Sequence, residues 1–248
     1  PMRGPGPSAS RSGPNASPAS GATVGGMMAN NADGARSVYY GKTSDHVLGQ
    51  DVLLSDGSVA HLGPVSLEEL NAGRSAGTLE SRCYAVVRRL VSEHADEIRR
   101  RYPRILRRVG GYNLDEFVDQ GRPFNLAKLM VGSEGTLGVV LEAKVNLVPL
   151  PVAKAVLVIQ FADLLESLSA TPLILRHRPS AVEVMDKFIL DYTKQNASLD
   201  ALRRSFIDGA PGSLLCVDFY EDAPRGFPVR LPRLRWDLRS HHAASRCF

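Results

Sequence analysis

NLAKLMVGSEGTLGVV, residues 125–140, is the stretch of sequence that decides the fold of this chain. It joins a short helical segment to a strand through a loop that contains Gly132, Gly135 and Gly138. Because glycine has no Cβ and tolerates positive φ, such a loop lets backbone amides approach a ligand closely. By itself this pattern is only a weak indication of a nucleotide site. A second loop, upstream in the chain, strengthens it.

The second loop is GATVGGMMANNADGARSVYYG, residues 21–41. Its glycines and asparagines are residue types that accept tight turns and left-handed backbone. Met27, Met28 and Ala29 lie in its middle, which argues for burial. Buried irregular backbone must have its amides satisfied, and a bound ligand can do that. On this segment alone, an irregular surface loop is the alternative interpretation.

The rest of the chain predicts an α+β fold, because segments with strand patterns alternate with segments of helical spacing. Asp56-Gly57 predicts a hairpin turn, and Ser66 with Glu69 predicts a capping box at the start of a helix. The patterns predict strands at 47–54, 58–62, 139–148, 156–161, 179–185 and 213–220, and helices from 66, over 78–101, over 163–176 and over 186–195.

The two ends of the chain differ from its middle. Residues 1–20 are rich in Pro, Gly, Ser and Ala, so we expect them to be disordered or non-homologous. Residues 224–248 show no period or caps, and we expect an aperiodic tail. This tail holds many of the arginines behind the formal net charge of +4, with Asp237 as its single acid. Elsewhere the charge is nearly balanced, which argues against a nucleic-acid-binding protein.

Composition excludes several classes of protein. The apolar fraction of 44% and the charged fraction of 23% are ordinary for a globular protein. No apolar run approaches the roughly 18 residues of a membrane span, so we expect no transmembrane segment. Cys83, Cys216 and Cys247 form neither a disulfide framework nor a metal motif, and we expect a reducing, cytoplasmic location and no metal site.

Two arginines are candidate substrate ligands. Arg107 and Arg108 stand just before a Gly110-Gly111 bend, where a guanidinium fork could hold a carboxylate. The alternative is that both are ordinary surface arginines.

Together these segments resemble the FAD-linked oxidases that share the flavin-binding fold of vanillyl-alcohol oxidase. Within that family they are similar to the D-lactate, glycolate and D-2-hydroxyglutarate dehydrogenases. The segments are residues 21–49, RRVGGYNLDEF (107–117) and 125–151, while 178–196 resembles the start of the family's C-terminal, substrate-side domain. The resemblance covers about residues 14–223. Its Tyr-Gly-Lys-Thr-x-Asp-His-Val form looks most like members fused to, or partnered with, an iron–sulfur segment.

The resemblance implies a domain plan and a cofactor. Residues 21–151 would be the second part of a two-subdomain FAD-binding fold, and 152–223 a truncated C-terminal domain. FAD would lie in a cradle of backbone amides, which hold phosphate without needing a cation. We call these residues the predicted cradle: Gly25, Gly26, Asn30, Asn31, Gly34, Tyr40 and Gly41 on one wall, and Glu134, Gly135, Gly138 and Val139 on the other.

The implied reaction is oxidation of a D-2-hydroxy acid to the 2-keto acid, with hydride passing to the flavin and Arg107 or Arg108 holding the carboxylate. Two departures stand against it. The family's glycine-rich phosphate loop of the P-x-G-x-G-T type and its His-Gly-Asp-Gly-like segment are both missing, so we expect a fragment, possibly inactive. The alternatives are an FAD-using transferase like alkylglycerone-phosphate synthase, and an inactive fragment or interaction module.

Overall fold

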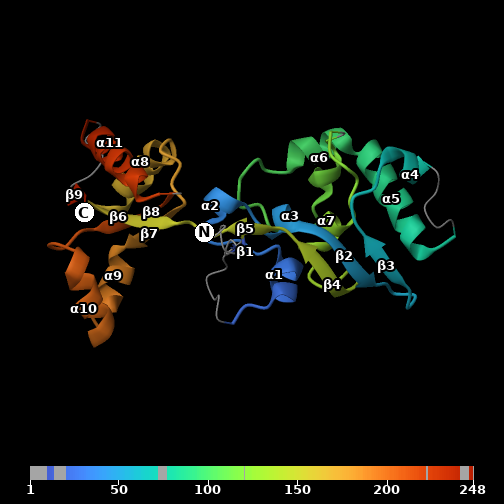
Figure 1. Cartoon of the computed structure of the whole chain (residues 1–248), viewed down its shortest axis with the longest axis horizontal. Coiled ribbons are helices and arrows are strands. Elements are labelled where there is room, and N and C mark those ends of the chain that lie inside the picture. Colours follow the sequence, from blue (N-terminus) through green and yellow to red (C-terminus); the bar gives the residue numbers. More distant parts are fainter. Residues whose placement is uncertain are drawn as a thin grey trace, which may run out of the picture. The chain divides into compact units, whose positions relative to one another are not determined.

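A computed structural model describes residues 10–13, 21–71, 77–119, 121–221, 223–240 and 246–247. The chain forms two compact units (Figure 1). Unit 1 comprises Pro1–Ser37 and Gly41–Pro149, and unit 2 comprises Val38–Tyr40 and Leu150–Phe248.

Unit 1 is built on a three-stranded antiparallel sheet in the order β3-β2-β4. Its strands are β2 (Val47–Leu53), β3 (Val59–Leu62) and β4 (Val139–Val145). The predicted hairpin between β2 and β3 is confirmed. Gly57 takes the turn at φ 81°, and the Asp56 carboxylate accepts hydrogen bonds from the Ser58 amide (3.0 Å) and hydroxyl (2.6 Å).

Helices cover this sheet, and those that begin at Val24, Leu67 and Leu79 start at side-chain caps. The Ser66 capping box is confirmed, since Ser66 N donates to Glu69 Oε2 (2.9 Å) and Glu69 N donates to Ser66 Oγ (3.2 Å). The helices of unit 1 are α1 (Val24–Asn30), α2 (Ser37–Tyr40, whose last three residues belong to unit 2), α3 (Thr43–His46), α4 (Leu67–Asn71), α5 (Leu79–Glu93), α6 (Ala95–Arg101), the 3-10 helix η1 (Leu114–Phe117) and α7 (Ala127–Met130).

The helix predicted over 78–101 is instead two helices. The backbone leaves helical values at His94 (φ −120°, ψ 19°), which separates α5 from α6. The apolar spacing continues across this break, because Tyr84, Val87, Val91 and Ile98 are all buried. Spacing alone therefore could not reveal it.

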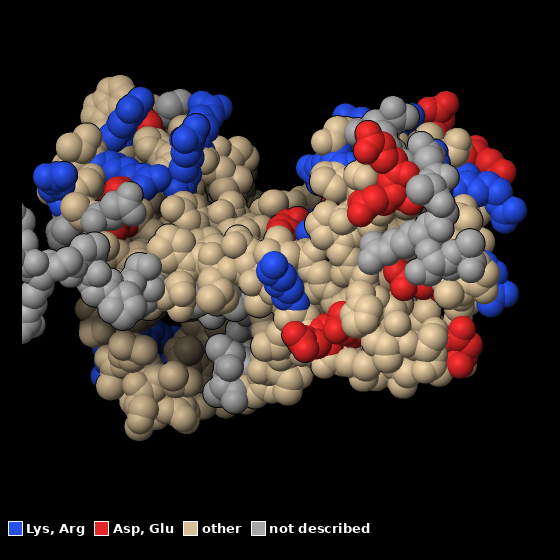
Figure 2. Space-filling view, turned by 45° about the vertical axis from the view of Figure 1, so that its right-hand side comes forward, with Lys and Arg blue, Asp and Glu red and all other residues tan. Residues whose placement is uncertain are grey.

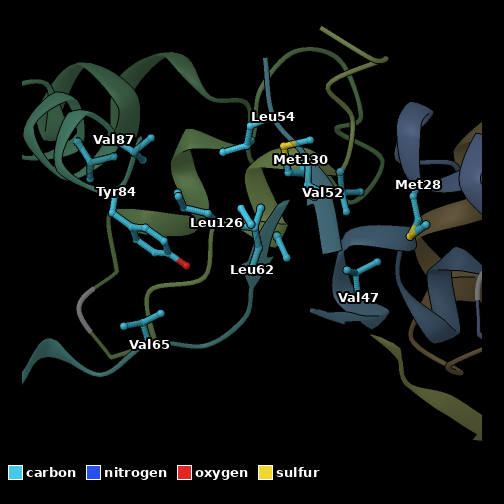
Figure 3. Close-up of a cluster of buried hydrophobic side chains, with 14 of the residues drawn as sticks. Met28, Val47, Val52, Leu54, Leu62, Val65, Tyr84, Val87, Leu126 and Met130 are labelled. Atoms are coloured by element: carbon cyan, nitrogen blue, oxygen red, sulfur yellow. The ribbon is translucent and has the colours of Figure 1, made fainter. Parts of the chain in front are cut away.

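The core of unit 1 joins the sheet to α1, α5 and α7. Its buried members include Met28, Val47, Val52, Tyr84 and Leu126, as Figure 3 shows. Met28 belongs to the glycine-rich loop at 21–41 and therefore connects that loop to the core. The burial predicted for the middle of that loop is confirmed at Met28, which is 3% exposed.

Two expectations near the ends of unit 1 need correction. Ser10–Ser12 forms strand β1, which pairs with β5 (Leu147–Pro149), so these residues are not disordered. The other residues of the segment 1–20, apart from Gly13, lie outside the described residues. The strand predicted at 139–148 is two strands, because β4 pairs with β2 whereas β5 pairs with β1, and the change of partner falls at Asn146.

Unit 2 is an antiparallel sheet in the order β7-β8-β6-β9, with helices packed on it. The predicted caps are confirmed: Asp163 accepts from Glu166 N (3.0 Å) and Asp186 from Ile189 N (2.9 Å). Its elements are β6 (Ala153–Phe161), α8 (Leu164–Leu175), β7 (Ala181–Asp186), α9 (Lys187–Thr193), α10 (Ala197–Phe206), β8 (Ser213–Glu221), the 3-10 helix η2 (Pro224–Gly226), α11 (Phe227–Ser240) and β9 (Arg246–Cys247).

The segment predicted as an aperiodic tail contains a helix, α11. Its apolar residues Phe227, Leu231, Leu234 and Leu238 are spaced by four, three and four, which is a helical period. All four pack in the core of unit 2 with α8 and the sheet. Two prolines conceal the pattern. Pro228 falls in the first turn, where no amide donor is needed, and core packing overrides the cost of the interior Pro232.

Leu234→Ala should therefore destabilise unit 2 by about 2–5 kcal/mol, because Leu234 is fully buried and its loss leaves a cavity. Urea unfolding followed by the fluorescence of Trp236, the only tryptophan, measures this change. Val229→Ala is the matched control on the same helix, since Val229 is 73% exposed. Equal stability of the two variants would show that α11 does not pack on the sheet.

Within the described part of the chain, every helix is too short or too polar to cross a membrane.

Candidate functional site

The two loops that the sequence singles out lie together in unit 1. Gly132 N donates to Met28 O (2.9 Å), and Glu134 N donates to Ala29 O (3.0 Å). The Asn30 side chain adds a longer contact, from Nδ2 to Glu134 Oε1 (3.4 Å). The expectation that the segments 21–41 and 125–140 share one place in the fold is confirmed.

The first wall of this place is α1 and its caps. Thr23 Oγ1 accepts from Gly26 N (3.1 Å) and fixes the start of the helix. Asn31 ends it in the left-handed region, at φ 52°. The Asn31 side chain is fully buried, and its Oδ1 accepts from Ser44 N (2.9 Å). Asn31 thus ties the end of α1 to α3.

Asn113 holds the second wall. Its Nδ2 donates to Lys128 O (2.9 Å) and Val131 O (2.7 Å), and its Oδ1 accepts from Arg108 Nη2 (3.1 Å). The side chain is fully buried. One amide therefore joins the segment 107–117 to α7 and to the start of the glycine loop, and orders the loop without a ligand.

Most glycines of the second wall are required by the fold. Gly132 and Gly135 have φ of 85° and 80°, where residues with a Cβ are strained. A Cβ on Gly138 would lie 2.7 Å from Val52 Cγ1 and 3.0 Å from Leu53 O, so β4 could not pack on β2. None of these three glycines needs a ligand to explain it.

Gly25 is different. It lies inside α1 at an ordinary helical φ, and a Cβ placed on it would meet no described atom within 4 Å. Glycine costs up to about 1 kcal/mol relative to alanine in a helix, and Gly25, which is exposed in the first turn of α1, makes no contact that would require glycine. Open space beside a helical glycine, at the wall of a loop cradle, fits a ligand that approaches the backbone closely.

Two buried polar atoms add to this. Asn31 Nδ2 and Ser44 Oγ have no hydrogen-bond partner within the described residues. An unpaired buried polar group costs about 1–3 kcal/mol, and a bound acceptor is one way to remove that cost. Nearby, Lys128 Nζ donates to Ser44 O, and burial lowers the pKa of Lys128. These features suit a polar group bound at this end of α1.

The structure separates the two arginines. Arg108 is 8% exposed and forms an ion pair with Asp115 (Nη2–Oδ1, 2.6 Å), so it is not a surface arginine and its fork is not open to a substrate. The Arg107 side chain is 53% exposed. Its Nε pairs with Asp33 Oδ2 (3.0 Å) and its Nη2 donates to Gly34 O, which fastens it to the first wall.

Three residues of the predicted cradle lie apart from the contacts that join the two walls. Tyr40 packs with unit 2, where its ring centroid is 6.2 Å from that of Tyr220. Gly41 has φ 83°, and a Cβ there would overlap the Asp45 carboxylate, so its glycine serves the turn into α3. Val139 stands on β4 with 59% of its side chain exposed.

Next to the glycine loop lies an apolar cavity of about 510 Å³. It is bounded by β3, α5 and α7, and its lining includes Tyr112 of the segment 107–117 and Leu137 of the glycine loop. Glu80 and Arg82 are its only charged lining residues. Such a lining does not suit a small hydroxy acid, whose carboxylate needs a cation or several donors.

Sequence reasoning missed Asn113, Ser44 and Lys128 as parts of this place. Each has a partner at least 13 residues away in the sequence, although Asn113 also has a nearer one in Arg108. The Gly-Tyr-Asn-Leu motif could have indicated that Asn113 is important. The sequence did not reveal which backbone groups Asn113 binds.

Comparison with known proteins supports one cofactor chemistry. Residues 10–63 match the model of a family described as FAD binding domain, a match that begins within the segment expected to be non-homologous. The chain is 32% identical over 191 residues to D-2-hydroxyglutarate dehydrogenase of Pantoea ananatis, covering 77% of this chain and 19% of that protein. It is 26% identical over 176 residues to D-lactate dehydrogenase of Anaerostipes hadrus, covering 70% and 26%.

The chain thus spans about a fifth to a quarter of the length of these relatives. Two solved structures are similar in fold. One is an alkyldihydroxyacetonephosphate synthase, with a TM-score of 0.57 at 15% identity, covering 96% of this chain and 36% of that one. The other is p-cresol methylhydroxylase with substrate bound, with a TM-score of 0.53 at 13% identity, covering 97% and 40%.

Proposed function

Since this chain is a relative of the FAD-linked oxidases and dehydrogenases, with a FAD binding domain matched at residues 10–63, we propose that unit 1 contributes to an FAD site in an enzyme that oxidises a D-2-hydroxy acid. The observation that carries the proposal is the meeting of the two glycine-rich walls, with Gly25 open to a ligand on one of them.

The types of residue in the two walls of unit 1 are suited to binding FAD. Backbone amides and small side chains dominate both walls, and glycine-rich loops of this type can hold a phosphate group without a cation. When bound, FAD supplies an acceptor for the hydride that leaves the substrate carbon. The task of this chain is to orient that group and to keep water from it, for which the Asn113 and Asn31 hydrogen bonds give a rigid base.

The proposed substrate is a D-2-hydroxy acid of the lactate, glycolate or 2-hydroxyglutarate type. Its support is that relatives bear the names D-2-hydroxyglutarate dehydrogenase and D-lactate dehydrogenase. Of the two arginine candidates, Arg107 is the one we propose as carboxylate ligand, because Arg108 is buried against Asp115. As a partner we propose an iron–sulfur segment or subunit outside this chain.

Anaerobic reduction of the flavin tests this function. The chain is loaded with FAD, and the flavin band at about 450 nm is followed while D-2-hydroxyglutarate, D-lactate or glycolate is added. One of the three should bleach the band, and L-2-hydroxyglutarate and L-lactate should not. Dithionite is the positive control for reducible flavin. Bleaching by dithionite but by none of the three acids would contradict the proposed substrate class while leaving FAD binding intact.

A further inference from the structure

Unit 2 contains a cavity of about 580 Å³ that plays no part in the proposed function. It lies between the end of α8 and helix α11, and its charged lining residues include Arg176, Arg178, Arg230, Arg233, Glu221 and Asp237. Four of these six residues are arginines, so the cavity is a concentration of positive charge.

Both acids of the cavity already have partners. Glu221 Oε1 accepts from Arg230 Nη1 (2.7 Å), and Asp237 Oδ2 lies 2.7 Å from His177 Nε2. Glu221 is thus compensated by Arg230, while the negative charge of Asp237 remains in the lining, and the four arginines still outnumber the two acids.

Arg230 is also fully engaged, as part of the cavity wall. Its Nη2 donates to His177 O (2.9 Å) and Arg178 O (2.7 Å), and its guanidinium lies 5.0 Å from the Phe219 ring centroid. It fastens α11 to the loop after α8, where Arg178 has a left-handed φ of 51°. This contact fixes the shape of the cavity and leaves the remaining arginines around it.

Arg176, Arg178 and Arg233 are exposed and make no ion pair within the described residues. Two of them come from the end of α8 and its loop, and the third comes from α11. In Figure 2, Lys and Arg side chains gather over this part of unit 2. Three guanidinium groups on one cavity exceed the charge of Asp237, the acid that lies against His177, and they attract an anion of more than one charge.

We propose that this cavity binds a small molecule through a phosphate or pyrophosphate group. Guanidinium forks match the oxygen geometry of such groups and form charge-assisted hydrogen bonds with them. A monocarboxylate would leave most of the positive charge uncompensated, which favours a multiply charged group.

Isothermal titration of the full chain with inorganic pyrophosphate, at constant ionic strength, tests the proposal. Arg176→Gln and Arg233→Gln should each weaken binding about tenfold, which corresponds to loss of one charge-assisted contact. Arg235→Gln is the matched control, because Arg235 is an exposed residue of α11, the helix that carries Arg233, but lies outside the cavity. This variant should leave pyrophosphate binding unchanged. All three side chains lack packing roles, so the variants should fold.

Three results would overturn the proposal. The first is absence of binding up to about 10 mM pyrophosphate, beyond the millimolar range of weak sites. The second is equal weakening by Arg235→Gln, or binding of a single-stranded oligonucleotide that depends on Arg235, either of which would indicate a diffuse basic surface. The third is loss of pyrophosphate binding in Gly25→Ala, which would place the anion in unit 1.

Discussion

Asn113→Ala is expected to destabilise unit 1 by about 3–5 kcal/mol and to abolish FAD binding. The substitution removes both donors to Lys128 O and Val131 O and one partner of Arg108, all at a fully buried position. Each buried group left unpaired costs about 1–3 kcal/mol. Hydrogen exchange of the α7 and β4 amides measures the change within unit 1.

A second variant and a control sharpen this prediction. Asn113→Asp keeps the shape of the side chain but removes the donors, so it should destabilise unit 1 nearly as much as alanine does. Asn146→Ala makes the same chemical change at an exposed asparagine, and should have little effect. If Asn113→Asp exchanged amides like the wild type, the hydrogen bonds of Asn113 would not be what orders the glycine loop.

Gly25→Ala is expected to raise the stability of α1 and to lower the affinity for FAD. It should stabilise α1 by up to about 1 kcal/mol, because alanine is the better helix former and no described atom obstructs its Cβ. It should weaken FAD binding at least about tenfold, or 1.4 kcal/mol, because the added methyl group occupies the space where the ligand meets the helix. Flavin fluorescence titration and thermal unfolding measure the two effects on one variant.

Gly63→Ala serves as its control. Gly63 also has open space around its Cβ position and no positive φ, but it lies away from both walls. It should leave FAD affinity unchanged. If Gly25→Ala and Gly63→Ala bound FAD equally well, the open space at Gly25 would have no connection with the cofactor.

Local signals predicted the elements whose causes are local. The Asp56-Gly57 turn, the Ser66 capping box and the Asp163 and Asp186 caps each depend on residues within three positions, and each is confirmed. The resemblance to the FAD-linked oxidases is confirmed as well, by the FAD binding domain match and by the related dehydrogenases.

Features with distant causes could not be predicted. The pairing of Ser10–Ser12 with β5 joins positions more than 130 residues apart. Helix α11 was hidden because Pro228 and Pro232 suggested a break that burial of Leu234 and Leu238 overrides. The sequence also could not distinguish Gly138 from Gly25, because only the packing of distant residues shows the difference. Gly138 is required by its contact with Val52, whereas no contact requires glycine at position 25.

The roles of the cradle residues and of Arg107 stay predictions, since they concern a ligand and not the fold. The structure nevertheless narrows them. Gly25, Gly26, Asn30, Asn31 and Glu134 belong to the segments that meet at the two walls, whereas Tyr40, Gly41, Gly135 and Gly138 have other structural reasons.

Equilibrium dialysis of the wild-type chain against FAD tests directly whether unit 1 forms an FAD site. We expect saturable binding of FAD by the folded chain. We also expect the stability of unit 1 to rise by about 2.7 kcal/mol when free FAD is a hundredfold above its dissociation constant. Circular dichroism on the same sample verifies that the chain is folded. A folded chain that retains no FAD and gains no stability from it would contradict the account.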